Sequence, residues 1–490
     1  MAENQSRYSS AVLALALLPP LLSGERPHPV IRDRGTHFLL RARWVFAILE
    51  WMTCGQQWGQ SRECYAEGSS LRKTRLSKLI KPGVGLSRSG VLAFLLAFLA
   101  TLLTPSTSQL AIEQPDVGLG AFLAERDHAY LVSDMEFDWL VWNLQWSMAE
   151  PLSKGSYEWL GLDELLAYAQ TEGLKVVLRV DSAPAWASGG LEGAPPKNMG
   201  DFGDFMSVLA TRAARKVAGY VIWNEPNLPM NWGGNPSPAE YVEMLQAVYP
   251  RIKAADADAA VVTAGMATTG GPGGSLCGLG GELASMQLAG YTKELYASGV
   301  VNDLDFICDI YRKEGQPYFD ALGSHPYGFA YEPQRNPSSV SGLAFRRVEQ
   351  QRALMEMGGD AAKQIWVIEF GWILDPGGRC YDWGDWPTRT WQIVSEKKQA
   401  QYLTSAYLYA DTSYPWMGVM SFFNMDFATV YWYDYCEPAR WYSVAYRMDH
   451  EDPGNSPIVY RQAYFALQGM VNALAGGPKA FLPLAVRTHD

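Results

Sequence analysis

The feature that most constrains this sequence is a regular alternation of short apolar runs with longer amphipathic stretches from about residue 115 onward. Eight runs have the length and composition of buried strands, at 117–122, 139–144, 175–180, 220–224, 261–266, 319–324, 364–370 and 419–423. Stretches with helical periodicity lie between or after them, at 162–172, 202–216, 238–254, 342–357, 397–409 and 460–474. Strands that alternate with helices predict a parallel sheet, and eight of them predict an α/β fold of the closed (β/α)8 TIM-barrel type over 115–480.

An open, doubly wound α/β sheet is the competing architecture. Its dinucleotide-binding form carries a GxGxxG motif directly after the first strand. No such motif follows the first apolar run of this sequence, which favours the closed barrel.

Two glutamates stand where predicted strands end. The apolar run at 220–222 leads into WNEPN at 223–227, and Pro226 ends this strand because proline has no N–H for the ladder. The run at 365–368 leads in the same way into Glu369. Counted along the chain, Glu225 ends strand four and Glu369 ends strand seven. In a (β/α)8 barrel the chemistry lies at the carboxyl ends of the strands, and these two strands face one another there.

Two carboxylates at facing strand ends are the arrangement that a retaining glycosidase needs. One is the nucleophile, and the other protonates the leaving group and later activates water, with the two about 5–5.5 Å apart. We assign Glu225 as the acid/base and Glu369 as the nucleophile. The structural alternative is that each glutamate belongs to an ion pair at its strand end. The matching positions of the two favour catalysis.

The WNEPN segment resembles the strand-four motif of clan A retaining glycoside hydrolases, and IEFGW at 368–372 is similar to their strand-seven motif. The branch that the sequence most resembles is that of the β-xylosidases, the α-L-iduronidases and related cellulase-like barrels. The segment that runs from Trp139 through Trp146 to Trp159 also resembles the second-strand region of the clan. The resemblance covers about residues 115–475 and implies a (β/α)8 glycoside hydrolase.

The resemblance also implies roles for residues near the pair. Asn224 would bind the sugar 2-hydroxyl, since an amide both donates and accepts, and a turn-capping Asn is the alternative. His325 and Tyr327, in the segment that closes strand six, would contact the substrate and the nucleophile, and a loop-anchoring His-Pro turn is the alternative. Independently of the resemblance, Arg179 at the end of strand three is a candidate to neutralise or orient Glu369. A simple buried salt bridge is the alternative for Arg179.

The sequence departs from the clan in two places. Val141 stands two positions after Trp139, where members often carry a basic residue, so the electrostatic role is expected to shift to Arg179. Strand eight ends in FFN at 422–424, where the clan often places a Trp as a sugar platform. Phe423, or a loop Trp, would take that part.

Aromatic residues make up 13% of the chain, and many fall in the predicted loops after strands seven and eight. Aromatic faces stack on the apolar face of a pyranose, so roughly two or three of these rings are expected to line subsites while the others pack the loops. Trp146 and Trp372 are candidate substrate-binding residues. Asp382 and Asp426 are candidates for binding sugar hydroxyls.

Charge is divided unevenly along the chain. Of its 40 Lys and Arg and 51 Asp and Glu residues, 13 and 6 fall in residues 1–110, which leaves the remainder strongly acidic. An acidic main domain argues against a nucleic-acid partner. The six histidines are scattered and neither CxxC nor HExxH occurs, so we expect no metal site and no cofactor.

Residues 1–110 are expected to form a basic N-terminal region of low order. Within it, at about 88–108, a basic stretch leads into about 13 apolar residues and then into small and polar ones, which is the order of a secretory signal. The run is short for a membrane span, which needs about 20 residues. Because signals begin at the amino terminus, we expect the true start near residues 70–90. The alternative is an uncleaved signal anchor that holds the protein at a membrane through residues 90–103.

Export would permit disulfides. The spacing suggests Cys277 with Cys308 and Cys380 with Cys436, and four free thiols are the alternative.

The sequence thus predicts a secreted or extracytoplasmic enzyme that hydrolyses a β-linked sugar with net retention. Its partner would be an oligosaccharide or polysaccharide substrate. A carbohydrate-binding barrel without catalysis and a transglycosylase that uses the same pair are the alternatives. The sugar and linkage depend on loop contacts that the sequence does not place.

Overall fold

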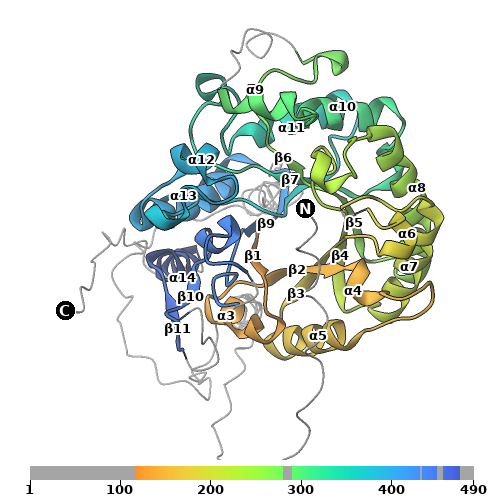
Figure 1. Ribbon diagram of the computed structural model, residues 1–490, viewed down its shortest axis with the longest axis horizontal. Coiled ribbons are helices and arrows are strands. Elements are labelled where there is room, and N and C mark those ends of the chain that lie inside the picture. Colours follow the sequence, from red (N-terminus) through yellow and green to blue (C-terminus); the bar gives the residue numbers. More distant parts are fainter. Residues whose placement is uncertain (1–116, 192, 280–289, 431–432, 450–455, 475–490) are drawn as a thin grey trace, which may run out of the picture. The chain divides into compact units, whose positions relative to one another are not determined.

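The computed structural model describes residues 117–191, 193–279, 290–430, 433–449 and 456–474 (Figure 1). All of them belong to the second of two units into which the chain divides, Pro105–Asp490. The predicted N-terminal region at 1–110, with its signal-like or anchoring segment at 88–108, lies outside the described residues and stays a prediction.

The central feature is a closed barrel of parallel strands (Figure 1). The strands are β1 (Gly118–Leu123), β2 (Trp139–Gln145), β3 (Lys175–Asp181), β4 (Val217–Ile222), β5 (Ala260–Thr263), β6 (Met266–Ala267), β7 (Ala321–His325), β8 (Gln364–Val367) and β9 (Met417–Phe422). Segments β5 and β6 form one barrel strand that Ala264 and Gly265 interrupt, so the barrel has eight strands in chain order. The sheet closes where β5 and β6 meet β7. The predicted TIM barrel is confirmed.

Helices surround this barrel (Figure 1). The longer ones are α3 (Ala129–Asp134), α5 (Leu160–Glu172), α7 (Met199–Arg212), α8 (Pro238–Ala255), α9 (Gly290–Ala297), α10 (Asp303–Arg312), α11 (Arg347–Met357), α13 (Glu396–Ser413) and α14 (Gln462–Leu474). Side chains cap several of their first turns by accepting from backbone N–H groups, as Asn198, Ser237, Asn302 and Ser395 do. An antiparallel pair, β10 (Ala445–Arg447) and β11 (Ile458–Tyr460), precedes α14.

Every predicted helical stretch contains a helix in the structure, with shifted ends. The largest shift is in α11, which begins at Arg347 rather than at 342. Helix α10 was not predicted, although its buried face repeats at helical spacing through Leu304, Ile307 and Cys308. It lies in the crossover between the fifth and sixth barrel strands, β5/β6 and β7, where the strand–helix alternation leaves a place for a helix.

The apolar interior layer of the barrel takes one side chain from each strand, namely Phe122, Val141, Val177, Val221, Val262, Ala321, Trp366 and Val419. Val141 belongs to this layer, so an apolar residue is needed where the resemblance suggested a basic one. Trp139 packs edge to face against Trp366, with ring centroids 5.6 Å apart. Gly219 leaves room for this indole, since a Cβ there would lie 2.8 Å from the Trp366 ring.

Two backbones approach one another closely where the barrel closes. The Gly323 N–H on β7 donates to the Thr263 hydroxyl at 2.9 Å. A Cβ at Gly323 would overlap the Thr263 carbonyl oxygen and crowd the backbone at Ala264. This junction therefore depends on glycine.

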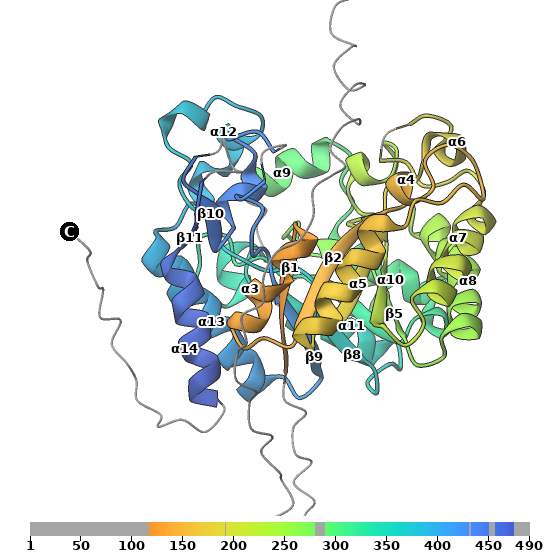
Figure 2. The ribbon, with the colours of Figure 1, turned by 90° about the horizontal axis from the view of Figure 1, so that it is seen from below.

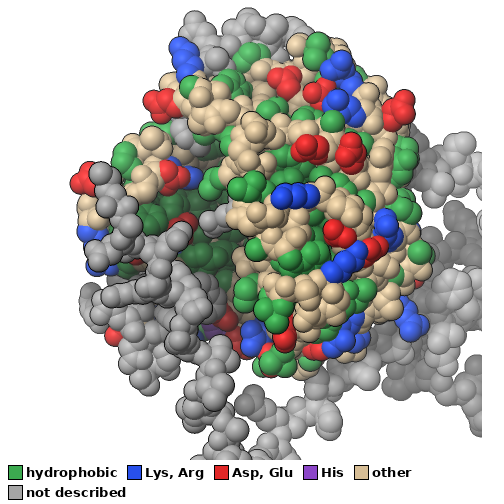
Figure 3. All heavy atoms as spheres, turned by 45° about the vertical axis from the view of Figure 1, so that its right-hand side comes forward, with side chains coloured by type: hydrophobic (Ala, Val, Ile, Leu, Met, Phe, Trp, Pro, Cys, Tyr) green, Lys and Arg blue, Asp and Glu red, His purple; other side chains and the backbone are tan. Residues whose placement is uncertain are grey.

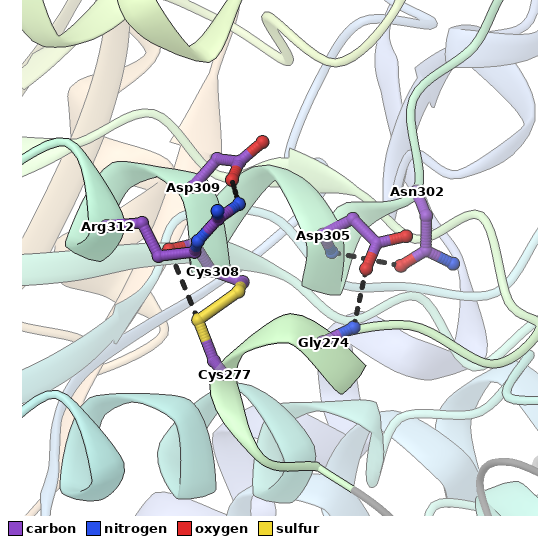
Figure 4. Close-up of a disulfide and its surroundings, with 7 residues drawn as sticks. All are labelled: Gly274, Cys277, Asn302, Asp305, Cys308, Asp309 and Arg312. Atoms are coloured by element: carbon purple, nitrogen blue, oxygen red, sulfur yellow. Dashed lines mark hydrogen bonds and ion pairs between the residues drawn. A yellow bond between two sulfur atoms is a disulfide. The ribbon is translucent and has the colours of Figure 1, made fainter.

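Both suggested disulfides are present, Cys277–Cys308 and Cys380–Cys436. The first ties the short 3-10 helix at Ser275–Cys277 to α10 (Figure 4), and nearby the Gly274 N–H donates to Asp305 at 2.7 Å. The second joins the loops that follow β8 and β9. Because disulfides persist in oxidising compartments, the two bridges indicate an extracytoplasmic location.

Short helices gather at one end of the barrel, at the top of Figure 2. They include α4 (Trp146–Ala149), α6 (Ala185–Ser188) and α12 (Trp386–Arg389), and each follows the carboxyl end of a strand. We call this end the mouth. Among the described residues, no helix has both the length and the apolar character of a membrane span. On the face drawn in Figure 3, acidic and basic side chains are interspersed.

We expect Gly323→Ala to destabilise the fold by roughly 1–3 kcal/mol, because the added methyl group forces β5 and β7 apart. The matched control is Gly469→Ala in α14, where a Cβ meets open space. That exchange should stabilise by roughly 0.5–1 kcal/mol, since alanine is the better helix former. Chemical unfolding followed by tryptophan fluorescence measures both. Equal effects of the two exchanges would contradict the proposed role of the junction.

Candidate active site

Glu225 and Glu369 lie at the mouth, each just beyond a strand. Strand β4 ends at Ile222, earlier than predicted, because the next residues leave the extended conformation. Trp223 and Glu225 have positive φ angles of 75° and 40°. For residues other than glycine this backbone costs on the order of 1–3 kcal/mol each and clusters at functional sites. The strain marks the turn that carries Asn224 and Glu225.

The structure brings the two carboxylates together around His325. One oxygen of each glutamate and one ring nitrogen of His325 all lie within 4.8 Å of one another. The His325 ring is fully buried at the end of β7, with Nδ1 3.0 Å from Glu225 Oε1 and 3.7 Å from Glu369 Oε2. This spacing suits a retaining pair, whose carboxyl groups stand about 5–5.5 Å apart.

The two carboxylates have different surroundings. The side chain of Glu369 is 8% exposed, and that of Glu225 is 18% exposed. Burial alone would raise the pKa of Glu369, but His325, the Arg179 guanidinium and the Tyr327 hydroxyl together lower it below its usual value. Glu369 is therefore held as a carboxylate at neutral pH.

Arg179, near the end of β3, is the centre of a polar network. Its Nη1 donates to Glu369 Oε1 and, at 3.0 Å, to Asn224 Oδ1. Its Nε lies 3.1 Å from Asp181 Oδ2 and 3.3 Å from Asn143 Oδ1. Burial opposes the charge of Arg179, but the carboxylates of Glu369 and Asp181 raise its pKa above the ordinary value. Because Arg179 holds the Asn224 oxygen, the Asn224 NH2 group is turned toward other acceptors.

Tyr327 fixes the second oxygen of the same carboxylate. Its hydroxyl donates to Glu369 Oε2 at 2.7 Å. Burial and the nearby carboxylate raise the pKa of Tyr327 well above its usual value, so the phenol stays a donor. Both Glu369 oxygens thus have a set orientation, one from Arg179 and one from Tyr327.

Two of the predicted substrate-binding residues, Trp146 and Trp372, are buried in the protein rather than exposed at the mouth. Trp146 is fully buried, donates to Glu150 Oε2 at 2.7 Å and stacks on Phe205. Trp372 is 1% exposed and donates to the Tyr331 carbonyl oxygen at 2.8 Å. Neither indole presents a face to the mouth, because partners distant in sequence enclose both rings.

The end of β9 corrects a second expectation. Asp426 is fully buried, and its carboxylate accepts from the Ala124 and Glu125 N–H groups at 2.7 and 3.1 Å. His128 Nδ1 lies 2.9 Å from the same carboxylate, so Asp426 is committed to protein partners rather than to sugar hydroxyls. Phe423 keeps a partly exposed position, packed edge to face on Phe122.

Sequence reasoning missed residues that support the site. Asn143 pairs in register with Arg179 across β2 and β3, and it shares the inward parity of Val141, which could have identified it. Gly265 is needed because a Cβ there would overlap the His325 ring. Its only sequence signal is a glycine inside an apolar strand.

Two carboxylates and an imidazole are also metal-ligand types, and they form the one such cluster found among the described residues. Both Glu369 oxygens, however, already accept hydrogen bonds from Arg179 and Tyr327. A metal ion would have to stand beside the Arg179 charge. The donor set therefore favours proton transfer and nucleophilic chemistry.

No protein-family model matches the sequence, and no curated protein matches it. Solved structures are similar to it at low identity. A family 39 glycoside hydrolase from Bacteroides cellulosilyticus WH2 is 18% identical with a TM-score of 0.49, over 74% of this chain and 64% of that protein. A glucosidase from Croceicoccus marinus is 12% identical with a TM-score of 0.49, over 74% and 68%. Xylanase 10B from Thermotoga maritima is 12% identical with a TM-score of 0.42, over 74% and 97%.

We expect Arg179→Met to destabilise the protein by roughly 3–5 kcal/mol at neutral pH, because it leaves buried carboxylates without their cation. The control is Arg212→Met, which removes an exposed pair with Asp163 and should cost less than about 1 kcal/mol. Urea unfolding at several pH values measures both.

The stability that Arg179 provides should change with pH in a defined direction. A carboxylate with a lowered pKa stabilises the fold above its unfolded pKa, and this contribution is lost as pH falls through the folded pKa. The difference between wild type and Arg179→Met should therefore shrink in acid. A difference that stays constant with pH would show that Glu369 is not held by Arg179.

Proposed function

We propose that the barrel is a retaining glycoside hydrolase that cleaves a β-linked sugar, with Glu225 as acid/base and Glu369 as nucleophile. The supporting observation is the pair itself. Two glutamates from facing strands have carboxylate oxygens within 4.8 Å of one another, and Glu369 is held as an anion by a cation and a phenol. The proposed catalytic domain is 115–480, and no cofactor enters the proposed reaction.

In the first step the Glu369 carboxylate attacks the anomeric carbon and the glycosidic bond breaks. Glu225 gives its proton to the leaving oxygen, so that a covalent glycosyl-enzyme and an alcohol form. His325 holds Glu225 through its Nδ1. In the second step Glu225 takes a proton from water, whose oxygen displaces Glu369 and restores the original configuration.

The residues next to Glu225 and Glu369 have proposed roles that fit this reaction. The Asn224 NH2 group is available to donate to a sugar hydroxyl, since Arg179 already occupies its oxygen. Tyr327 and Arg179 keep the nucleophile ionised and prevent it from rotating. Phe423, a partly exposed ring just beyond β9 that packs against Phe122 and Tyr327, is the proposed sugar platform.

We also propose that the protein acts outside the cytoplasm. The two disulfides support action outside the cytoplasm. Export through the signal-like segment at 88–108, or anchoring through 90–103, is the proposed route.

The test is hydrolysis of a panel of aryl β-glycosides by the wild-type protein and three variants. Glu369→Gln should abolish turnover. Glu225→Ala should lower kcat by about 10²–10⁴. For aryl glycosides with good leaving groups, whose turnover is then limited by the second step, added azide should restore part of the rate by attacking the glycosyl-enzyme. Glu356→Gln, exposed on α11, is the control and should leave activity unchanged.

The products distinguish the alternatives. Proton NMR of the first sugar released should show the configuration of the substrate. Transfer to an added sugar acceptor in preference to water would instead identify a transglycosylase. Sugar binding without any turnover would identify a carbohydrate-binding barrel, and undiminished turnover in Glu369→Gln would refute the assignment of the nucleophile.

A further inference from the structure

A cavity of about 480 Å³ opens at the mouth beside the glutamate pair, beyond the ends of β1, β2 and β3. Glu125, Trp142, Asn143, Arg179, Phe427 and Tyr433 are among the residues that line it. Its volume is in the range of sites that bind small ligands, which is about 300–1,000 Å³. The glutamate pair does not line it.

One side chain joins the cavity to the candidate active site. Arg179 lines the cavity and also donates to Glu369 Oε1. Asn143 lines it as well and accepts from Arg179. A chain of sugars that has one unit at Glu369 can therefore place a neighbouring unit here.

The walls have the composition that a pyranose needs. Tyr433 is partly exposed and stacks on the buried ring of Phe427, with centroids 5.3 Å apart, which gives the wall a flat aromatic surface. Trp142 is half-buried, and its Nε1 is fixed by donation to the Ala124 carbonyl oxygen at 3.2 Å. Asn143 and Glu125 add polar groups for hydroxyls. Stacking surface with few polar groups is typical of carbohydrate sites.

The charges in the cavity discriminate between sugars. Both cations that line it are already paired, since Arg126 contacts Glu164 and Arg179 contacts Glu369 and Asp181. Glu125 adds a carboxyl group, near the charges of Asp426, Asp127, His128 and Arg126. A uronic acid placed here would meet the like charge of Glu125, while the two cations of the lining already have carboxylate partners.

We propose that this cavity is a second sugar subsite that takes a neutral sugar unit of the substrate and disfavours a uronic acid, with Glu125 as the residue that sets this preference. The inference rests on the proposed function, because it assumes an oligosaccharide substrate. It names the substrate class as neutral β-linked oligosaccharides.

The backbone of Glu125 is held in place by Asp426, which follows β9, the last strand of the barrel. Its N–H donates to Asp426 Oδ2 at 3.1 Å, next to the contact of His128 with the same carboxylate. Burial, Asp426 and Asp127 raise the pKa of Glu125 to about 7, and the charges of His128 and Arg126 oppose them. Among the groups of the cavity wall, Glu158 adds negative charge and Arg179 positive charge. Glu125 therefore gains its negative charge near neutral pH.

The experiment measures binding by calorimetry in the Glu225→Ala protein, so that turnover does not interfere. The probes are two matched pairs, cellotetraose with β-1,4-tetraglucuronate and mannotetraose with β-1,4-tetramannuronate. We expect at least one neutral probe to bind about tenfold or more tightly than its acidic counterpart. Adding Glu125→Gln should narrow that ratio severalfold, and adding Trp142→Ala should weaken the neutral probe by about tenfold. Glu356→Gln, added as a control, should change neither value.

The pH dependence gives a second readout. The neutral-to-acidic affinity ratio should rise between about pH 6 and about pH 8 as Glu125 ionises, and Glu125→Gln should remove that rise. Equal affinities within each pair, failure of both neutral probes to bind, or a ratio that Glu125→Gln leaves unchanged would each overturn the proposal. Glu125→Gln keeps the shape of the side chain, so the test stands even where Trp142→Ala fails to fold.

Failure of this proposal is distinguishable from failure of the proposed function. Aryl glycosides that are cleaved in a Glu369-dependent way, together with an unchanged ratio, would retain the hydrolase and reject the subsite. Discrimination by Glu125 without any cleavage would retain the subsite and reject the hydrolase.

Discussion

The Arg179 guanidinium is the interaction on which the mouth of this barrel depends. Glu369, Asp181 and Glu225 bring three carboxylates into a small, largely buried volume. Without a cation, at least one of the buried carboxylates would bind a proton, because like charges at short distance cannot all ionise. Arg179 removes that conflict and, with the same nitrogen, orients Asn224. The order of the polar groups is thus set by one planar, always charged side chain.

The packing of the apolar interior layer explains why the cation beside Glu369 comes from β3, the third strand. Val141 and Val177 fill the interior layer, and Phe122 lies under Arg179 with its ring 4.8 Å from the guanidinium carbon. The next inward position on β3 above Val177 is Arg179, and on β2 it is Asn143, paired with it in register. A basic residue at 141 would have been buried in the apolar layer. The apolar residue at 141, where members of the clan often carry a basic one, is therefore a consequence of how this interior layer is packed.

Local patterns predicted the parts of the fold and site that local forces determine. Apolar runs, Pro226 and the order of elements were enough for the barrel and for the positions of Glu225 and Glu369 at facing strand ends. The fate of Trp146 and Trp372 was not predictable in this way, because rings from other elements, such as Phe205 on α7, decide whether an indole is core or platform. Gly265 escaped notice for the same reason. Its importance comes from the ring of His325, which lies far from it in sequence.

The shared use of Arg179 also connects the proposed sugar cavity to Glu369, the proposed nucleophile. The guanidinium that lines the cavity is the one that lowers the pKa of Glu369. A carboxylate bound in the cavity would compete with Glu369 for that charge, and the pKa of Glu369 would rise as its share of the cation fell. A larger fraction of Glu369 would then carry a proton. A neutral sugar would leave the pairing of Arg179 unchanged, so the proposed selection of neutral units and the ionised state of Glu369 would have the same electrostatic cause.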